Sequence, residues 1–266
     1  MAEPCIVAQG LGRAFGQKWA VRGLDLAIGE GELYGFLGPN GAGKTTTMRM
    51  LTGMLRPSEG AVRLCGLDPA LDAAAQKRIT GFVPDTPPLY DYLTGRQYVA
   101  LVASLWRVGR RERDERMARL VHTLGLDDVL DELCRGYSHG TRKKIHTAAV
   151  LCTAPRVLLL DEPTTGLDPR SARALKDLLR DEARGGTTIL FSTHVLDAAE
   201  QICDRVGILA HGRLQAEGTI QELRAQRGDG SLEDIFLRLT GAAADGSSES
   251  GSAETDAGTG DAPVRG

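Results

Sequence analysis

Short apolar runs alternate with glycine-containing turns near the start of the chain, and this alternation predicts short β-strands. The runs Ile6–Ala8, Leu24–Ile28 and Leu33–Phe36 indicate a small, partly antiparallel sheet. The apolar run at 33–37, followed by helical spacing at 44–51, predicts a buried strand that leads through a loop into a helix.

Between about residues 89 and 154 the apolar residues recur at helical spacing, most clearly at 97–107 and 111–124. We therefore expect a helical subdomain, about 89–154, inserted into an α/β core. The basic segment 107–116 is expected to be a solvent-facing surface of this subdomain.

Two later apolar runs end in polar residues. VLLLDE, at 157–162, ends in Asp161 and Glu162, and the run at 188–192 leads to His194. Strands of a parallel sheet are apolar throughout, and their carboxyl ends share the edge where ligands bind. We expect these three polar side chains to meet at that edge.

The glycine-rich stretch 38–46, GPNGAGKTT, fits the phosphate-loop spacing G-x-x-x-x-G-K-[ST]. Glycines allow the backbone to curl so that N–H groups converge on one anion. The lysine adds a mobile positive charge, and the next hydroxyl suits Mg²⁺. The predicted phosphate-binding residues are Gly38, Pro39, Asn40, Gly41, Ala42, Gly43, Lys44, Thr45 and Thr46.

The carboxylates and the histidine complete this predicted nucleotide site. Asp161 would hold Mg²⁺ through water, Glu162 would orient an attacking water, and His194 would contact the γ-phosphate. The alternative for the two carboxylates is an ordinary helix N-cap, and the alternative for the histidine is a structural role. Phe15, ahead of the loop, could stack on a purine base or be an ordinary core or surface aromatic. Trp19 is a weaker candidate for the same stacking role.

Composition and charge are those of an ordinary soluble globular protein. The 266 residues are 42% hydrophobic and 25% charged, with a net charge of −3. Much of this negative charge lies in 241–266, a polar acidic segment that predicts a disordered tail. Before it, 226–240 predicts an amphipathic extension. The remaining chain is nearly neutral, so no nucleic-acid partner is expected.

The five cysteines are scattered and form no C-x-x-C pair. They indicate small core residues of a reduced cytosolic protein, with neither a disulfide framework nor a metal site. The sequence has no signal-peptide pattern and no apolar run of about 20 residues, the length that a membrane span needs. Any membrane-spanning part is therefore expected on another chain.

The order of these motifs closely resembles the nucleotide-binding subunit of ATP-binding-cassette (ABC) transporters. Besides the phosphate loop, the resemblance rests on YSHGTRKK at 137–144, VLLLDEPTTGLD at 157–168 and STH at 192–194. It covers roughly residues 5–240. It implies a P-loop NTPase (RecA-like) α/β core with an N-terminal antiparallel β subdomain and the inserted helices, the ATPase domain itself being 5–225.

The resemblance also implies roles for individual residues. Ser138 and Gly140 correspond to the signature motif, which binds the ATP of a facing subunit, and Asp168 to a loop at the dimer interface. Phe15 corresponds to the adenine-stacking aromatic. Lys44, Glu162 and His194 would be catalytic, while Thr45, Asp85 and Asp161 would hold Mg²⁺. From the residues alone, Ser138 predicts the N-cap of a helix that runs to about Cys152.

Two departures from the family pattern affect these roles. The usual L-S-G-G-Q is replaced by Tyr137-Ser-His-Gly-Thr141, and the usual glutamine before the helical subdomain is replaced by Asp85. These changes bear on hydrolysis rate and coupling, whereas ATP binding does not depend on them. Similar variants, with a C-terminal LEDIFLRLT, are typical of the bacterial exporter branch, in which the residues around 85–94 touch the membrane subunit.

The resemblance therefore implies a Mg²⁺-dependent ATPase subunit of an exporter. It would be cytoplasmic, attached to the inner face of the membrane through an integral membrane subunit, and would pair with a second nucleotide-binding domain as a homodimer or heterodimer. A soluble ABC ATPase that remodels a ribosome or nucleic-acid complex is the alternative. A GTPase would need an N-K-x-D base reader, and Asn40 is the only asparagine in the chain.

Overall fold

The structure is a computed structural model that describes residues 4–227 and 231–241. It contains a three-stranded antiparallel sheet in the order β2-β1-β4 and a six-stranded sheet in the order β5-β6-β7-β3-β8-β9. The strands are β1 (Ile6–Phe15), β2 (Lys18–Ile28), β3 (Leu33–Leu37), β4 (Glu59–Leu64), β5 (Thr80–Val83), β6 (Val157–Asp161), β7 (Thr188–Thr193), β8 (Arg205–Ala210) and β9 (Arg213–Gly218).

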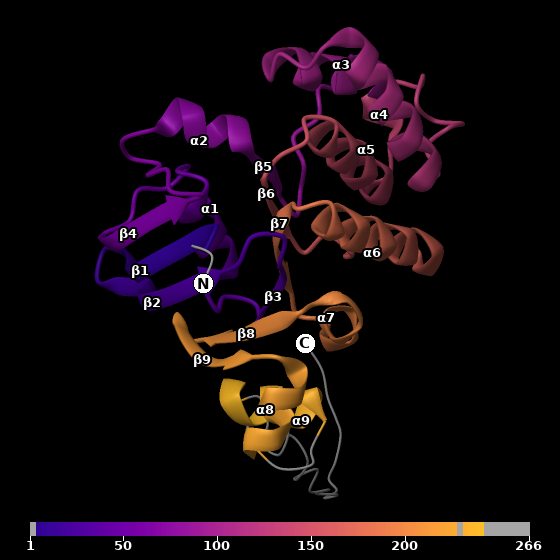
Figure 1. The fold of residues 1–266 in the computed structure, drawn as a ribbon. Helices are drawn as coiled ribbons and strands as arrows, with labels where there is room; N and C mark the ends of the chain where they lie inside the picture. Colours follow the sequence, from indigo (N-terminus) through magenta and orange to yellow (C-terminus); the bar gives the residue numbers. More distant parts are fainter. Residues whose placement is uncertain (1–3, 228–230, 242–266) are drawn as a thin grey trace, which may run out of the picture.

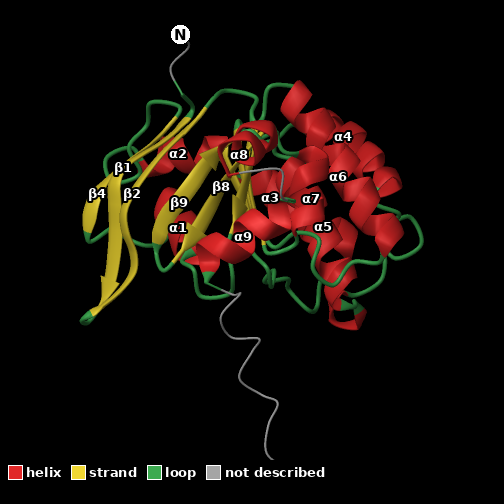
Figure 2. Ribbon diagram, turned by 90° about the horizontal axis from the view of Figure 1, so that it is seen from below, coloured by secondary structure: helices red, strands yellow, loops and turns green. Residues whose placement is uncertain are grey.

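In Figure 1 α3, α4 and α5 lie together at one end, α6 and α7 lie beside the larger sheet, and α8 and α9 lie next to β9 at the other end. Figure 2 shows the small antiparallel sheet on the side away from α3 to α7. The helices are α1 (Lys44–Leu51), α2 (Ala73–Ile79), α3 (Gly95–Leu105), α4 (Arg110–Thr123), α5 (His139–Leu151), α6 (Pro169–Arg184), α7 (Leu196–Ile202), α8 (Ile220–Arg227) and α9 (Leu232–Thr240), with a 3₁₀ turn at Cys134–Gly136.

The architecture confirms the predicted fold class, an α/β core with an antiparallel β subdomain and inserted helices. The helices α3, α4 and α5 lie in the chain between β5 and β6, strands that pair in parallel. One detail of the prediction is wrong: β3 does not belong to the N-terminal antiparallel sheet. It pairs in parallel with β7 and β8 because its residues are buried on both faces, as a central strand requires.

The central strands divide the core into two layers. Along β6, Leu158 and Leu160 face the helices α3 to α7, whereas Leu159 faces the antiparallel sheet and α1. Alternate side chains of a strand point to opposite faces, so an uninterrupted apolar run fills both layers at once. Burying one such leucine stabilises the fold by about 1.5–3 kcal/mol.

The sequence did not predict α6, α7, β8 or β9. Within the described residues no helix has the length and apolarity to cross a bilayer. The predicted tail 241–266 lies, beyond Gly241, outside the described residues. The predicted extension contains α9, whose Leu232 and Ile235 are buried.

The cysteine prediction is wrong for one pair, because Cys5 and Cys65 form a disulfide. They flank the antiparallel partners Ile6 and Leu64, which brings their Cα atoms to 4.1 Å. Their separation of 60 residues conceals this proximity in the sequence. The free cysteines of the described chain are Cys134, Cys152 and Cys203.

A buried histidine joins the inserted helices to the sheet. His146 of α5 lies 3.2 Å from the carbonyl oxygen of Phe82 in β5 through Nε2, and 2.7 Å from the hydroxyl of Tyr98 in α3 through Nδ1. A carbonyl only accepts, so Nε2–H donates to Phe82 and Nδ1 accepts from Tyr98. Burial lowers the pKa of His146 to about 4.

This lowered pKa predicts a loss of stability in mild acid. The unfolded chain takes up a proton at His146 as pH falls below its ordinary pKa of 6.5, while the folded chain resists until about pH 4. The free energy of unfolding should therefore fall by about 2 kcal/mol between pH 7 and 5 from this group alone. Denaturant titrations of His146→Gln should show a pH dependence weaker by that amount, whereas His122→Gln, at an exposed site, should match the parent. Equal pH dependence in His146→Gln and the parent would contradict this account.

Candidate active site

Strand register brings most of the predicted site residues to one edge of the larger sheet. Leu37 of β3 lies opposite Thr193 of β7, and Asp161 of β6 lies opposite Ser192 of β7. The three strands are parallel and in this register their carboxyl ends are adjacent. The segments that follow them are the loop 38–46, Glu162 and His194.

The loop 38–46 approaches neighbouring backbone too closely for side chains at two of its glycines. A Cβ on Gly43, which has φ +110°, would lie 2.6 Å from the carbonyl oxygen of Ala20. A Cβ on Gly38 would clash with the carbonyl oxygen of Leu209. Glycine is therefore required at both positions, and the loop is fixed against β2 and β8 at the start of α1.

Lys44, at the first position of α1, is buried and turned into the loop. Its Nζ donates to the carbonyl oxygens of Gly38 at 2.6 Å and Pro39 at 3.3 Å. It also forms an ion pair with Glu162 Oε1 at 3.3 Å. The positive charge is thus held in the cavity that the loop encloses, beside a carboxylate.

Two hydroxyl groups orient the carboxylate of Asp161. Thr45 Oγ1 donates to Asp161 Oδ2 at 2.6 Å, and Ser192 Oγ donates to Oδ1, also at 2.6 Å. Asp161 is almost fully buried. The Thr45 hydroxyl and the Asp161 carboxylate together present oxygen ligands of the kind that Mg²⁺ prefers.

Glu162 is held by contacts at both its backbone and its side chain. Its backbone has φ +48°, a left-handed conformation uncommon outside glycine, and its N–H donates to the carbonyl oxygen of Ser192 at 3.2 Å. Its Oε2 lies 3.0 Å from His194 Nδ1, and its Oε1 faces Lys44. His194 and Glu162 therefore lie in direct contact, as the strand order led us to expect.

The loop and the two carboxylates line one cavity of about 250 Å³, and His194 lies beside it in contact with Glu162. Its lining is Ala20, Pro39, Asn40, Gly41, Ala42, Gly43, Lys44, Thr45, Thr46, Asp85, Asp161 and Glu162. All but Ala20 are predicted site residues. Gly38 contributes through its carbonyl contact with Lys44.

Asp85 contributes to this cavity but is also bound to a lysine. Its Oδ1 accepts from Lys143 Nζ at 2.9 Å. The sequence did not predict the contact of Lys143 with Asp85 or the contact of Ser192 with Asp161. Ser192 could have been found as a hydroxyl at the end of an apolar strand, but a lysine within a helical run carries no signal of burial.

Ser138 and Gly140 lie away from the cavity, at the N-terminus of α5. The predicted N-cap is confirmed: Ser138 Oγ accepts from the N–H of Thr141 at 3.2 Å, and Cys152 is the C-cap. A Cβ on Gly140 would lie 2.8 Å from the carbonyl oxygen of Gly166, so this glycine permits a close approach to the loop after β6.

Asp168, rather than the Asp161–Glu162 pair, caps the helix that follows β6. Its carboxylate accepts from the N–H and the hydroxyl of Ser171, which lowers its pKa below the ordinary value. This argues against the capping alternative for the two carboxylates.

Phe15 also lies outside the cavity, at the end of β1. It is 52% exposed, and the guanidinium of Arg13 lies 4.8 Å from the centre of its ring. Its face is therefore covered in part by a cation. The exposure of Phe15 excludes the alternative of a core aromatic.

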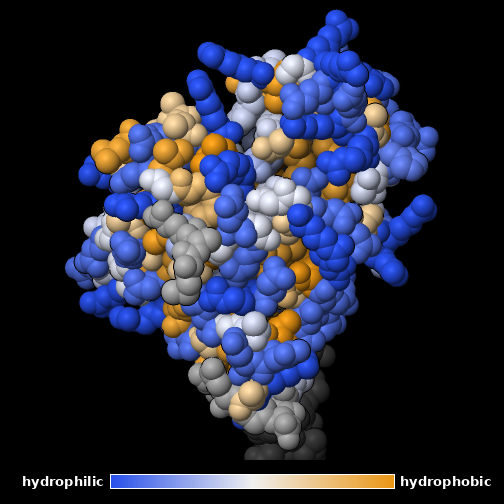
Figure 3. Space-filling model, viewed as in Figure 1, coloured by the Kyte–Doolittle hydropathy of each residue, from blue (hydrophilic) through white to orange (hydrophobic). Residues whose placement is uncertain are grey.

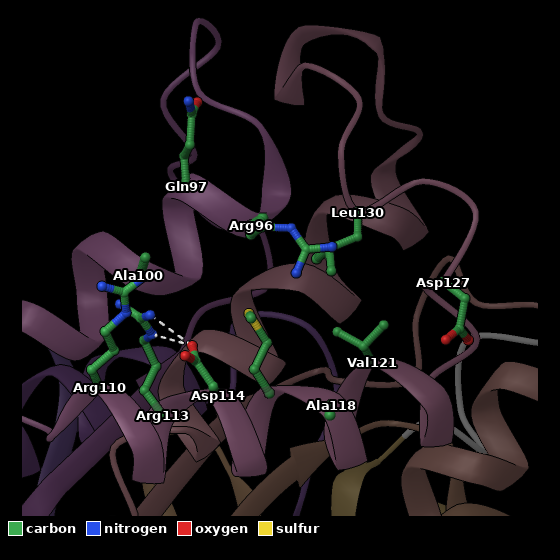
Figure 4. A pocket seen from close by; sticks show the side chains of 11 residues that line it. Arg96, Gln97, Ala100, Arg110, Arg113, Asp114, Ala118, Val121, Asp127 and Leu130 are labelled. Carbon is green, nitrogen blue, oxygen red and sulfur yellow. Dashed lines mark hydrogen bonds and ion pairs between the residues drawn. The ribbon is translucent and has the colours of Figure 1, made fainter.

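A larger cavity of about 660 Å³ lies between α3 and α4 and contains none of the predicted residues. Figure 4 shows Arg113 paired with Asp114 on its floor. Arg96, on its wall, is paired with Asp131. The lining of this cavity holds neither a phosphate loop nor a pair of carboxylates beside a hydroxyl, so the loop cavity is the candidate active site.

Comparison with known proteins agrees with this geometry. The family model for "ABC transporter" matches residues 21–165. The chain is 41% identical to "Daunorubicin resistance ATP-binding protein DrrA3" of Streptomyces coeruleorubidus, covering 91% of this chain and 76% of that protein. It is 40% identical to "Daunorubicin/doxorubicin resistance ATP-binding protein DrrA" of Streptomyces peucetius, covering 88% and 70% respectively.

Solved structures show the same fold. A structure described as "ATP binding subunit of ABC transporter" superposes with a TM-score of 0.84 at 29% identity, covering 88% of this chain and 99% of that one. The structure of cbiO1 from Clostridium perfringens, described as part of an ABC transporter complex, gives a TM-score of 0.74 at 27% identity, covering 90% of this chain and 96% of that one. The chain therefore belongs to the ABC transporter family, as an ATP-binding subunit with ATPase activity.

Proposed function

We propose that this chain powers export through a separate membrane subunit, by ATP-driven pairing with a second nucleotide-binding domain. The observation that carries the proposal is the convergence of the loop 38–46, Asp161, Glu162 and His194 in and beside one cavity. The drug-resistance proteins to which the chain is 40–41% identical support an export role.

In this proposal the loop binds the phosphates of ATP. Its N–H groups and the Lys44 ammonium stabilise negative charge, and Phe15 stacks on the adenine. Thr45 and Asp161 would hold Mg²⁺, because their oxygens already meet at 2.6 Å in this cavity. The metal would supply further positive charge beside the phosphates.

Glu162 orients and activates the attacking water, since its carboxylate lies in the cavity wall. Lys44 and His194 both contact this carboxylate in the structure. As the γ-phosphoryl group leaves, these two side chains stabilise the charge that develops on it. The chemistry thus depends on positioning and electrostatics, as in other phosphoryl transfers.

A second domain supplies the contacts of Ser138 and Gly140 with the bound ATP. Ser138 is exposed at the N-terminus of α5, where helix N–H groups favour an anion, but it does not line its own cavity. A facing subunit, arranged head to tail, would place its Ser138 and Gly140 over the bound ATP. Binding then joins the two domains and hydrolysis separates them.

A mostly apolar groove of about 480 Å³ offers the docking surface for the membrane subunit. It lies between β5 and α3, and its lining includes Met54, Phe82, Tyr90, Leu101, Leu105 and Trp106. Met54, Tyr90 and Leu105 are mostly exposed. In Figure 3 apolar patches interrupt the mostly polar surface around α2, beside this region. The groove includes residues of the segment 85–94, which the family resemblance assigns to this contact.

Glu162→Gln should keep ATP binding and lower the turnover rate at least about a hundredfold, because the amide cannot accept the proton of the attacking water. Nucleotide titration and steady-state ATPase assays would measure the two effects. The matched control is Glu59→Gln, on the exposed edge strand β4, which should hydrolyse ATP like the parent. Parent-like turnover in Glu162→Gln would refute the role given to Glu162.

Leu105→Asp should abolish co-purification with an integral membrane protein, because it places a charge in the apolar groove. Leu71→Asp is the control, since Leu71 is even more exposed (83% against 66% for Leu105) but lies outside the groove. Affinity purification from native membranes, with identification of the bound proteins, distinguishes these outcomes. Recovery of ribosomes or DNA in place of a membrane protein would favour the alternative function.

A further inference from the structure

Lys143 of α5 is a fully buried cation whose three N–H bonds are all used. Its Nζ donates to the carbonyl oxygen of Glu162 at 2.8 Å, to the carbonyl oxygen of Thr165 at 3.0 Å and to Asp85 Oδ1 at 2.9 Å. A buried ammonium persists only when it is paired and hydrogen-bonded throughout, and this one is.

The partners of Lys143 belong to different parts of the fold. Glu162 and Thr165 lie in the loop that follows β6, and Asp85 follows β5. Lys143 itself lies in the second turn of α5, on the inserted helices. One side chain therefore joins the helical subdomain to the two loops that flank the cavity.

Lys143 contacts Glu162 at a point where the backbone adopts a sparsely populated conformation. Glu162 has φ +48°, and such a conformation in a residue other than glycine persists only when its surroundings hold it. Its N–H is held by the carbonyl oxygen of Ser192 on one side, and its carbonyl group is held by Lys143 on the other. The N–H and the carbonyl group belong to the two peptide planes on either side of the Glu162 Cα atom, so these contacts hold both planes and with them the direction in which the side chain leaves the backbone.

We propose that Lys143 is a positioning residue for ATP hydrolysis. By holding the carbonyl group of Glu162, it sets the direction of the Glu162 carboxylate and links that direction to the position of the inserted helices. Asp85 neutralises the buried charge of Lys143, so in this structure the Asp85 carboxylate is the ion-pair partner of Lys143. The inference rests on the proposed role of Glu162 in hydrolysis.

Steady-state kinetics of Lys143→Met, in the full chain, test this proposal. Because Lys143 does not line the cavity, KM for ATP should stay within about threefold of the parent while kcat falls about tenfold or more. The matched control is Lys144→Met, since the neighbouring lysine makes only a long contact with Ser171, at 3.4 Å. It should leave both constants unchanged.

A double-mutant cycle separates positioning from a merely structural role. If Lys143 acts through Glu162, then Lys143→Met should cause no further loss of single-turnover rate in the Glu162→Gln background. Should Lys143→Met fail to fold, the same cycle is run with Lys143→Gln, which keeps an amide NH2 group able to donate.

A parent-like kcat in the folded Lys143 variant, or a loss that multiplies with that of Glu162→Gln, would overturn the inference. The proposed function fails separately, through parent-like turnover in Glu162→Gln alone. Full turnover in the Lys143 variant beside an inactive Glu162→Gln would reject only the inference about Lys143.

Discussion

The register of three parallel strands is the constraint on which the site depends. Because β3, β6 and β7 end together, the phosphate loop, Asp161 with Glu162, and His194 reach one edge of the sheet. A shift of one residue in β6 would reverse the direction of Asp161 and exchange the two layers of the core. The apolar sequence of these strands therefore fixes the site as firmly as it fixes the fold.

Polar contacts between side chains then refine this arrangement. Thr45 and Ser192 hold the two oxygens of Asp161, and Lys44 and His194 hold those of Glu162. Because the Asp161 carboxylate is almost fully buried, moving Ser192 would leave one of its oxygens unsatisfied, which is costly in a low-dielectric interior. The chain's own side chains therefore organise the cavity around its phosphate loop, and such preorganised charges and donors are the condition for electrostatic catalysis.

The sequence predicts those features of the fold and the site that depend on local residue patterns. The phosphate loop, the strand before it, the Ser138 cap and the meeting of carboxylates with a histidine all follow from spacing. It could not predict contacts that depend on packing between distant segments. The burial of Lys143 arises from the way α5 docks on the loop after β6, and the Cys5–Cys65 disulfide arises from the pairing of β1 with β4. The position of Phe15 outside the cavity likewise depends on how the antiparallel sheet is placed.

The central claim is that ATP is bound between two nucleotide-binding domains, and crosslinking tests it most directly. Ser138→Cys and Asn40→Cys would be introduced into separate, differently tagged copies of the full chain, since both residues are exposed. Each single variant paired with the parent is the control, because the chain has cysteines of its own. The account predicts a crosslink between the two copies that forms with ATP and Mg²⁺ and is lost on their removal. No ATP-dependent crosslink, with ATP binding intact, would contradict it.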